Sequence, residues 1–539
     1  MSVLEGFRYW PPAPGFELEP AGAGRRYRHR PPSLWALVEE SAARVPEKQA
    51  LGDPVRTVTF ASLRDEVAMA AAYLAGLGVR RGERVALLLS GGVHFAVAFL
   101  AVVRLGAIAV PLNVKLTPVE LGHIVGHSGA TWILGEGAVA ANLGDADLGS
   151  LGTLRHLQVD PLDLPWLRPG AAAAPLGAPP GEDDLALLIY TSGTTGRPKG
   201  VRLSHANLIQ SVMSYAHTLG LTADDSTLIV VPLFYVTGLV AQLLLFLYLG
   251  GTTIIQPRFE PDAAVRLLHA HRITFFHAVA TVFIKLTEAG SRSGIKLEHL
   301  RLACCGGGPV TPAVIAALKR WLPGLDFRPV YGLTETSSPA TISPHDGLSR
   351  PEKPRSAGRP IPVVDCLVAD DDGKQLPPGE TGELLVRGAV VVDGYWEDEE
   401  TSKMAFGGGW FRTGDLARYD EDGYVYIVDR KKDLINRGGE KVSGSEVEAV
   451  LAEFPGVREV AVVAAPHPVY GETPAAFVVV DEPRLFEPEA LLAFARSRLA
   501  RFKVPTQVDI VDELPRSAYG KVLKGVLRER LSVSEGVAR

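Results

Sequence analysis

A glycine- and hydroxyl-rich segment near the middle of the chain has the composition of a phosphate-binding loop. Its eleven residues are Tyr190-Thr-Ser-Gly-Thr-Thr-Gly-Arg-Pro-Lys-Gly200, and an apolar run at 185–189 precedes them. Glycines let backbone N–H groups approach phosphate oxygens, hydroxyls donate hydrogen bonds, and the lysine supplies positive charge. The residues expected to bind the polyphosphate here are Thr191, Ser192, Gly193, Thr194, Thr195 and Gly196, with Lys199 as the cation. The segment predicts a polyphosphate site.

A flexible turn and the phosphate loop of nucleotide kinases are the two alternatives for this segment. A flexible turn has a similar composition. The kinase loop requires the pattern G-x-x-x-x-G-K-[ST]. Gly193 and Lys199 do not stand in that register, and Gly200 follows the lysine where a serine or threonine would be needed. The eleven residues together favour a phosphate loop of another kind, followed by a helix that Ser204 can cap.

The segment resembles the phosphate-loop signature of the adenylate-forming superfamily, which contains acyl-CoA synthetases, peptide-synthetase adenylation domains and beetle luciferases. The resemblance extends from about residue 32 to about residue 531, and later motifs follow in the family's order. Within the superfamily, the chain is most similar to acyl- or aryl-CoA ligases. Such enzymes have a large N-terminal domain and a small, mobile C-terminal domain.

A second motif, Tyr331-Gly-Leu-Thr-Glu-Thr336, resembles the family's adenine and metal site. The resemblance implies that Tyr331 stacks on adenine, Thr334 contacts the α-phosphate and Glu335 holds Mg²⁺. A hard cation that bridges phosphate oxygens prefers a carboxylate oxygen. The resemblance also implies that a glycine-rich strand end lies flat against the adenine, because only glycine lets a backbone come so close. Its residues are Gly306, Gly307 and Gly308.

The segment Gly409-Trp-Phe-Arg-Thr-Gly-Asp415 resembles the family's ribose site. The resemblance implies that Asp415 accepts hydrogen bonds from both ribose hydroxyls and that Arg430 is its partner there. An aspartate after a glycine is usually a turn residue. The spacing to Arg430, with a turn and a strand between them, favours the functional interpretation.

The remaining family motifs lie near the C-terminus. The resemblance implies that Lys432 is a hinge between the domains and that Gly438 and Gly439 line a tunnel for the thiol arm of coenzyme A. A glycine pair has no side chain to block a thin arm. It also implies that Lys521, in Leu514-Pro-Arg-Ser-Ala-Tyr-Gly-Lys521, is the catalytic lysine that contacts the carboxylate and the α-phosphate.

The residues expected around the acyl group are mostly apolar: Tyr235, Val236, Leu239 and Val279. The loop 232–238 carries no aspartate to pair with an ammonium group, so an amino acid is disfavoured as the substrate. Aryl-acid ligases of siderophore pathways carry a His-Asn pair where this chain has Tyr235-Val236. The pocket therefore favours an aliphatic acid, as in fatty acid metabolism, or an unsubstituted aromatic acid.

Together these motifs predict an acid–thiol ligase that uses ATP, Mg²⁺ and coenzyme A. The enzyme would convert a carboxylic acid to an acyl-AMP with release of pyrophosphate, and would then transfer the acyl group to coenzyme A. Transfer to a carrier-protein phosphopantetheine remains an alternative, as does a luciferase. A binding protein without activity is disfavoured because Glu335 and Lys521 are both present.

Secondary-structure patterns predict the elements that position these residues. The segments 84–89, 95–105 and 107–112 alternate as strand, helix and strand, which indicates an α/β fold with parallel or mixed sheets covered by helices. The residues after 430 predict their own helices at 445–453 and 488–500 and strands at 459–464 and 475–480. We therefore expect an N-terminal domain at 1–429 and a mobile α+β domain at 430–539.

Composition is that of a globular protein, with 47% hydrophobic and 22% charged residues in 539. A net charge of −6 gives no support for a nucleic-acid partner. Three cysteines without a CxxC pair make disulfides and zinc unexpected and favour the cytoplasm. The chain is expected to be a monomer or a homodimer.

The one stretch long enough to cross a bilayer, 228–255, contains no charged residue. Pro232, Gly238 and the pair Gly250-Gly251 interrupt it. These breaks predict a strand at 228–231, a buried helix at 239–249 and a strand at 252–255 rather than a transmembrane span.

Overall fold

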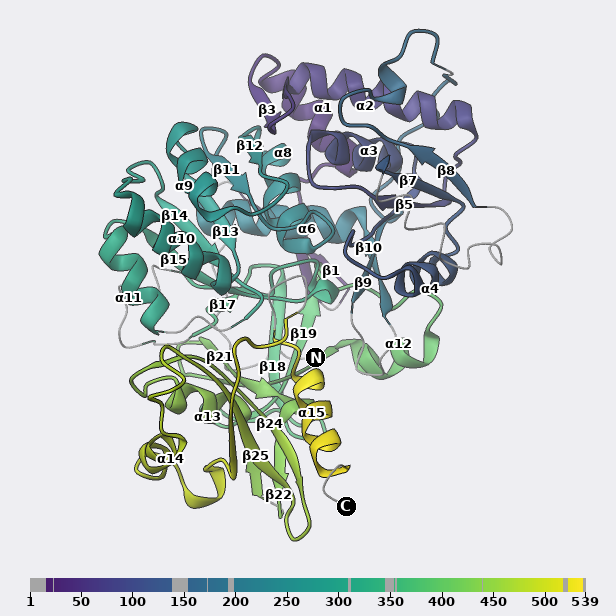
Figure 1. Ribbon diagram of the computed structural model, residues 1–539. Helices are drawn as coiled ribbons and strands as arrows, with labels where there is room; N and C mark the ends of the chain where they lie inside the picture. Colours follow the sequence, from purple (N-terminus) through teal and green to yellow (C-terminus); the bar gives the residue numbers. More distant parts are fainter. Residues whose placement is uncertain are drawn as a thin grey trace. The chain divides into compact units, whose positions relative to one another are not determined.

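A computed structural model describes residues 16–22, 24–137, 154–171, 173–191, 198–308, 312–344, 353, 356–438, 440–516 and 522–536, with the backbone only at 312–314, 432, 441 and 532–536. The described chain divides into two compact units (Figure 1). The larger contains the described residues up to Cys366 together with Val386–Phe411. The smaller contains Leu367–Leu385 and the described residues from Arg412 onward.

This division differs from the single domain boundary that the sequence predicts at residue 430. It assigns 367–385 and 412–429 to the smaller unit, whereas the sequence predicts that both belong to the N-terminal domain. The position of the hinge at Lys432 stays a prediction.

The first sheet of the larger unit has, among described residues, the strand order β10-β9-β6-β5-β7-β8. Its strands are β5 (Arg84–Leu88), β6 (Ile108–Pro111), β7 (Trp132–Gly135), β8 (Arg155–Gln158), β9 (Leu185–Thr191) and β10 (Lys199–Ser204). All neighbouring pairs are parallel except β9 with β10. The α4 helix (Pro118–Ser128) covers one face, where Leu121 and Ile124 pack against Leu88 and Val110. The predicted alternation of strand and helix at 84–112 is confirmed, with α3 at Val93–Arg104.

The ends of α4 show why this helix forms where it does. Thr117 and Glu120 make a capping box, and Pro118 occupies the first turn, where its missing N–H costs nothing. Gly129 ends the helix with φ 62°, a left-handed conformation that glycine adopts without strain.

The second sheet has the order β17-β16-β15-β14-β13-β11-β12-β3-β4 in the described part of the chain. Its strands are β3 (Gln49–Gly52), β4 (Thr57–Thr59), β11 (Ser226–Ile229), β12 (Thr252–Ile255), β13 (Phe275–Ala278), β14 (Leu302–Cys305), β15 (Asp326–Tyr331), β16 (Thr341–Ile342) and β17 (Arg359–Pro360). The strands from β3 to β15 in this order pair in parallel, and the two edges are antiparallel.

Helices cover both faces of the second sheet. On one face, Phe283 of α10 (Ala280–Ser293) contacts the rings of Phe276 and Phe327 edge-on. On the other face, Phe246 of α8 (Leu245–Leu249) stacks on Phe275, with ring centroids 5.8 Å apart. The other helices of the larger unit are α1 (Leu34–Arg44), α2 (Phe60–Leu77), α6 (His205–Leu219), α9 (Pro261–Ala270), α11 (Pro312–Trp321) and α12 (Glu399–Ala405), and a short hairpin pairs β1 (Leu18–Ala21) with β2 (Gly24–Tyr27).

The uncharged stretch 228–255 forms the strand, helix and strand that its sequence predicts. Between β11 and β12 lie α7 (Val236–Gly238), a π-helical segment η3 (Leu239–Leu244) and α8. The helical part begins three residues earlier than expected, and β11 two residues earlier. Within the described ranges, no helix is long and apolar enough to span a membrane.

Two further sheets lie wholly or mostly in the smaller unit, and residues 364–366, 386–388 and 411 of the first of them belong to the larger unit. One has the order β18-β19-β20-β21, with strands Val364–Ala369, Gly382–Gly388, Phe411–Tyr419 and Val425–Arg430. The other combines β22 (Ile435–Arg437), β23 (Glu440–Val442), β24 (Val457–His467), β25 (Gly471–Val480) and β26 (Gln507–Ile510). Helices α13 (Gly444–Leu451) and α14 (Pro488–Arg496) pack on one face, and α15 (Lys524–Gly536) packs on the other. The predicted α+β pattern after residue 430 is confirmed.

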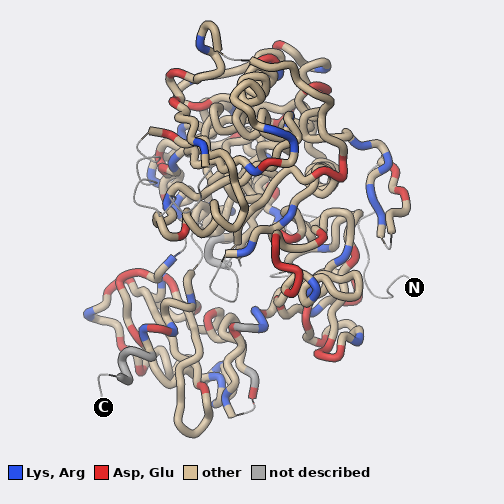
Figure 2. The backbone as a smooth tube through the Cα atoms, turned by 90° about the vertical axis from the view of Figure 1, so that its right-hand side faces the viewer, with Lys and Arg blue, Asp and Glu red and all other residues tan. Residues whose placement is uncertain are grey.

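Cys304, Cys305 and Cys366 are buried and free. Figure 2 shows basic and acidic residues interspersed along the described parts of both units.

Candidate active site

The phosphate loop connects the two strands of a hairpin. Thr191 pairs with Lys199 and Tyr190 with Gly200 in the β9–β10 ladder, so the ends of the loop are held side by side. Ser192, Gly193, Thr194, Thr195 and Gly196 lie outside the described residues. After the hairpin, Ser204 caps α6, since its Oγ accepts a hydrogen bond from the Asn207 N–H at 3.1 Å. The predicted cap is confirmed.

A tyrosine links the phosphate-loop lysine to the predicted metal ligand. The Lys199 Nζ lies 5.5 Å from the ring centroid of Tyr395, within the range of a cation–π contact. The Tyr395 hydroxyl donates a hydrogen bond to Glu335 Oε1 at 3.0 Å. Burial, and then the neighbouring Glu335 charge, raise the pKa of Tyr395, so the phenol stays protonated and donates.

Tyr395 is fixed in place by backbone contacts. Its N–H donates to Ser402 Oγ at 2.8 Å, and it forms an isolated bridge with Val201 of β10. The next residue, Trp396, donates its N–H to the Gly200 carbonyl at 2.7 Å. The segment that carries Tyr395 is therefore attached directly to the phosphate-loop hairpin. No motif in the sequence identified Tyr395; its only signal is an aromatic pair after Gly394.

The second motif forms a tight turn at the carboxyl end of β15. Tyr331 is the last residue of the strand, and Thr334–Thr336 form the 3₁₀ turn η4. A Cβ at Gly332 would lie only 1.5 Å from the Ser338 carbonyl oxygen, so the turn requires glycine there. The Glu335 carbonyl accepts a hydrogen bond from the Val392 N–H at 3.0 Å. Thr334 and Glu335 thus lie on a rigid turn at an edge where parallel sheets bind ligands.

The neighbouring strands end at the same edge. The glycines 306–308 follow β14, which pairs in parallel with β15, and Val279 follows β13. A Cβ at Gly306 would meet the Val330 carbonyl at 3.2 Å, whereas the Cβ position at Gly308 is open. The predicted adenine residues and one predicted acyl residue therefore come from adjacent strand ends.

The other predicted acyl residues precede or begin the helical segment after β11. Tyr235 lies immediately before α7, Val236 starts that helix and Leu239 starts η3. Burial raises the pKa of Tyr235, so its hydroxyl is neutral at physiological pH. A π-helical turn is uncommon and is frequent at functional sites.

The predicted ribose pair lies within the smaller unit. Asp415 and Arg430 face each other in the β20–β21 ladder, and Arg430 Nε is 3.2 Å from Asp415 Oδ1. Asp415 is buried. The structure brings these two residues together, and their role at a ribose stays a prediction.

The residues expected to serve thioester formation follow in the same unit. Lys432 lies in the 3₁₀ turn Lys431–Asp433, where Lys431 pairs with Asp371 at 2.8 Å and Asp433 pairs with Arg528. Gly438 has φ 60° in the turn that joins β22 and β23. Gly439 and Lys521 lie outside the described residues.

The donor set around Glu335 fits a magnesium ion that is bound mainly by its substrate. The described residues contain no group of three or more His, Cys, Asp or Glu that could hold a metal by themselves. Mg²⁺ in nucleotide enzymes is commonly held by one or two carboxylates together with phosphate and water oxygens. Glu335, oriented by Tyr395, can supply such a carboxylate.

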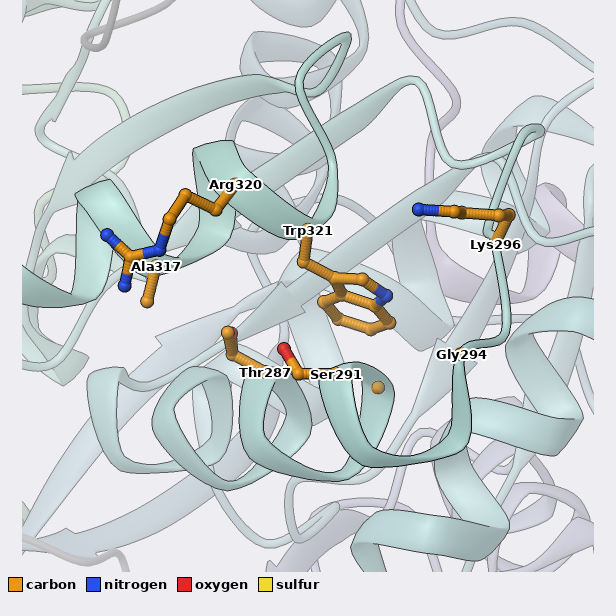
Figure 3. A pocket seen from close by; sticks show the side chains of 8 residues that line it. Thr287, Ser291, Gly294, Lys296, Ala317, Arg320 and Trp321 are labelled. Atoms are coloured by element: carbon orange, nitrogen blue, oxygen red, sulfur yellow. The ribbon is translucent and has the colours of Figure 1, made fainter.

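A separate groove lies between α10 and α11 (Figure 3). Its volume is about 260 Å³, and Trp321, Lys296 and Arg320 line it with residues of both helices. The Trp321 ring packs on Gly290, and its Nε1 donates to the Ile295 carbonyl at 3.0 Å. None of the predicted site residues line this groove.

Comparison with known proteins agrees with the motifs. The family model of the AMP-binding enzymes matches residues 38–396, and the model of the AMP-binding enzyme C-terminal domain matches residues 446–521. A feruloyl-CoA synthase of an Amycolatopsis species is 37% identical over 474 residues, which cover 88% of this chain and 94% of that protein. The long-chain-fatty-acid–CoA ligase FadD13 of Mycobacterium tuberculosis is 34% identical, with 92% and 98% covered.

Among solved structures, o-succinylbenzoate CoA synthetase from Bacillus subtilis in complex with its acyl-adenylate intermediate has a TM-score of 0.83 at 32% identity. The similarity covers 92% of this chain and 98% of that one. Motifs, fold and relatives agree along nearly the whole chain. The chain therefore belongs to the AMP-binding enzymes, the adenylate-forming superfamily that its motifs resemble.

Proposed function

We propose that this enzyme activates a carboxylic acid with ATP and transfers the resulting acyl group to coenzyme A. The observation that carries the proposal is the series of contacts from Lys199 through Tyr395 to Glu335, at the sheet edge where the predicted adenine residues also lie. The family membership and the names of the relatives, which are CoA ligases, support it. They favour coenzyme A over a carrier protein as the acceptor.

The first half-reaction joins the acid to AMP. A carboxylate oxygen of the substrate attacks the α-phosphorus of ATP, the bond to the β-phosphate oxygen breaks, and pyrophosphate leaves with its electron pair. No side-chain nucleophile is needed. Because all reacting groups are negative, the site has to supply positive charge at fixed positions. Lys199 and Lys521 are proposed to provide it, and a bound Mg²⁺ at Glu335 would neutralise charge on the phosphates.

Tyr395 is proposed as a positioning residue in this step. Its hydroxyl holds one carboxylate oxygen of Glu335, and its ring lies beside the Lys199 ammonium group. The tyrosine therefore orients the carboxylate while its ring separates two opposite charges.

The second half-reaction exchanges AMP for a thiol. The sulfur of coenzyme A attacks the acyl carbonyl, AMP leaves, and the thiol proton is released. The residues proposed to serve this step are Gly438 and Gly439, which leave room for the thiol arm. A change of backbone conformation at Lys432 is proposed to withdraw Lys521 before the thiol enters.

The acyl group is proposed to bind beside the helical segment that follows β11. Val236, Leu239 and Val279 provide apolar contacts there, and Tyr235 provides an aromatic one. Such a pocket suits an aliphatic or an aromatic acid, and both kinds appear in the names of the relatives.

Pyrophosphate release measured over a panel of carboxylic acids, with and without coenzyme A, tests the proposal. With one class of apolar acid, we expect the enzyme to release pyrophosphate from ATP. Without coenzyme A the release should stop after about one turnover, and with coenzyme A it should continue. Turnover with an amino acid, or pyrophosphate release that coenzyme A never accelerates for any acid, would contradict it.

A further inference from the structure

One buried histidine near the predicted adenine residues has no hydrogen-bond partner in the described part of the chain. His277 lies in β13 and only 2% of its surface is exposed. Neither Nδ1 nor Nε2 has a partner among the described residues. Buried polar atoms are nearly always hydrogen-bonded, because an unpaired group in the interior costs free energy. The imidazole of His277 therefore takes its hydrogen-bond partner from outside the described protein, either a bound water or a group of a ligand.

The position of His277 places it next to the proposed acyl site. Alternate residues of a strand share a face, so His277 lies on the same face as Val279, which continues β13 with extended backbone. A Cβ built on Gly306 would lie 3.5 Å from His277 Nε2. Because Gly306 has no side chain, nothing from that residue separates the imidazole from the strand ends of the site.

The surroundings of the ring are otherwise aromatic. The Tyr215 ring of α6 lies edge-on at a centroid distance of 5.9 Å, and Phe275 lies at 6.3 Å. The Tyr215 hydroxyl is 2.9 Å from Ser338 Oγ, in the turn that follows Glu335. The rings that contact His277 are thus aromatic, and the Tyr215 hydroxyl is already paired with Ser338.

The imidazole is neutral at physiological pH. Burial lowers the pKa of His277 to about 3. A neutral ring has one nitrogen that donates and one that accepts, so it suits an uncharged partner with a hydrogen to donate or a lone pair to offer. A neutral ring carries no positive charge to offset the cost of burying a second carboxylate, so an uncharged partner is favoured.

We propose that His277 Nε2 hydrogen-bonds an uncharged hydroxyl group that the substrate carries on the part of its acyl chain far from the carboxylate. The proposed substrate class is then a hydroxylated aromatic or aliphatic acid bound between apolar walls, with one polar contact at the inner end. This inference rests on the proposed function and deepens it, since it concerns which acid enters the same site.

Matched pairs of acids test the inference. The probes are 4-hydroxycinnamic acid with cinnamic acid, and 8-hydroxyoctanoic acid with octanoic acid. For each pair, the ratio of kcat/KM for pyrophosphate release is measured in the wild-type enzyme, in His277→Leu and in His277→Gln. His217→Leu is the control, because His217 Nε2 is also buried and unpartnered among described residues but its ring packs against Tyr27.

The wild-type enzyme is expected to prefer the hydroxylated member of one pair by about tenfold, the effect of one hydrogen bond in a buried site. His277→Leu should lose this preference while it keeps activity on the unsubstituted acid, His277→Gln should keep part of it, and His217→Leu should keep all of it. His277→Leu should also melt at the same or a higher temperature, since it removes an unpaired polar group.

An unchanged ratio in His277→Leu would overturn the inference, because the hydroxyl group would then not depend on the imidazole. A wild-type enzyme that prefers the unsubstituted acids would overturn it as well. If pyrophosphate is released with none of the acids, the proposed function itself has failed. That outcome differs from the two outcomes above, in which the enzyme is active but the preference for a hydroxyl group is absent or does not depend on His277.

Discussion

At the scale of single residues, the site depends on a tyrosine that stands between two charges. A direct ion pair between Lys199 and Glu335 would hide both groups from the substrate. Tyr395 instead contacts the ammonium group with its ring and the carboxylate with its hydroxyl. A hydrogen bond to a charged acceptor is stronger than one between neutral groups, so the tyrosine can fix the carboxylate firmly.

Tyr395→Phe tests this role. The variant keeps the ring beside Lys199 and loses only the hydroxyl, so the Glu335 carboxylate should rotate more freely. We expect a drop of about tenfold in the rate of adenylation and a rise in the Mg²⁺ concentration needed for half-maximal rate. Calorimetric titration of Mg²⁺–ATP should show the same weakening of binding without turnover.

Tyr426→Phe is the matched control, because Tyr426 also donates to a carboxylate, Asp420 Oδ2 at 2.9 Å. It should leave the Mg²⁺ dependence unchanged. If both variants shift that dependence equally, Tyr395 has no special part in positioning Glu335.

The site role of a residue inside a known motif could be predicted from the sequence. The site role of a residue outside any motif could not. Glu335 and Asp415 stand in segments whose neighbours identify them. Tyr395 and His277 are each a common residue type in an unremarkable segment. Their importance arises from contacts with residues far away in the chain, such as Glu335, sixty positions from Tyr395.

At the scale of elements, the site depends on turns that follow parallel strands. β13, β14 and β15 end at one edge, and each end carries predicted site residues. The turn after β15 is tight, because the chain at Gly332 passes against the Ser338 carbonyl. Sequence periodicity predicted strands and helices of this unit, but the order of the strands in the sheet depends on long-range pairing.

Gly332→Ala tests the close approach in this turn. The added methyl would overlap the Ser338 carbonyl oxygen, so the backbone would have to move. We expect a loss of stability of about 2 kcal/mol and a larger loss of adenylation, since Glu335 would be displaced. Thermal unfolding and pyrophosphate release measure the two effects.

Gly324→Ala is the control for the same substitution, because a Cβ at Gly324 meets nothing within 4 Å. It should change neither quantity. A Gly332→Ala variant that unfolds at the wild-type temperature with full activity would contradict the account of the turn.

At the scale of the whole molecule, the chain crosses between its two units more than once. Residues 386–411 belong to the larger unit, while the segments on both sides of them belong to the smaller. Backbone contacts of Tyr395 and Trp396 with β10 agree with this assignment. The sequence shows a change in its pattern of apolar residues near residue 430. It does not show that 386–411 belong to the larger unit, because that assignment arises from pairing between segments that are distant in the chain.

Lys432→Pro tests the proposed hinge. Proline fixes φ near −65°, so the backbone could no longer change freely between two conformations. We expect adenylation to continue and thioester formation to slow by at least about tenfold. Lys432→Ala, which removes the side chain and leaves φ free, should slow neither step. Single-turnover measurement of each half-reaction separates the two variants, and equal slowing of both steps by proline would contradict the hinge.

The central claim is that adenylation and thioester formation use different groups at one acyl carbonyl, and Lys521→Ala tests it most directly. Each half-reaction is measured alone: pyrophosphate release from acid and ATP, and acyl-CoA formation from supplied acyl-adenylate. A cation directed at developing charge contributes roughly 10²- to 10³-fold to a rate, so adenylation should fall by that factor while the thioester step stays near the wild-type rate. An equal loss in both half-reactions would contradict the account.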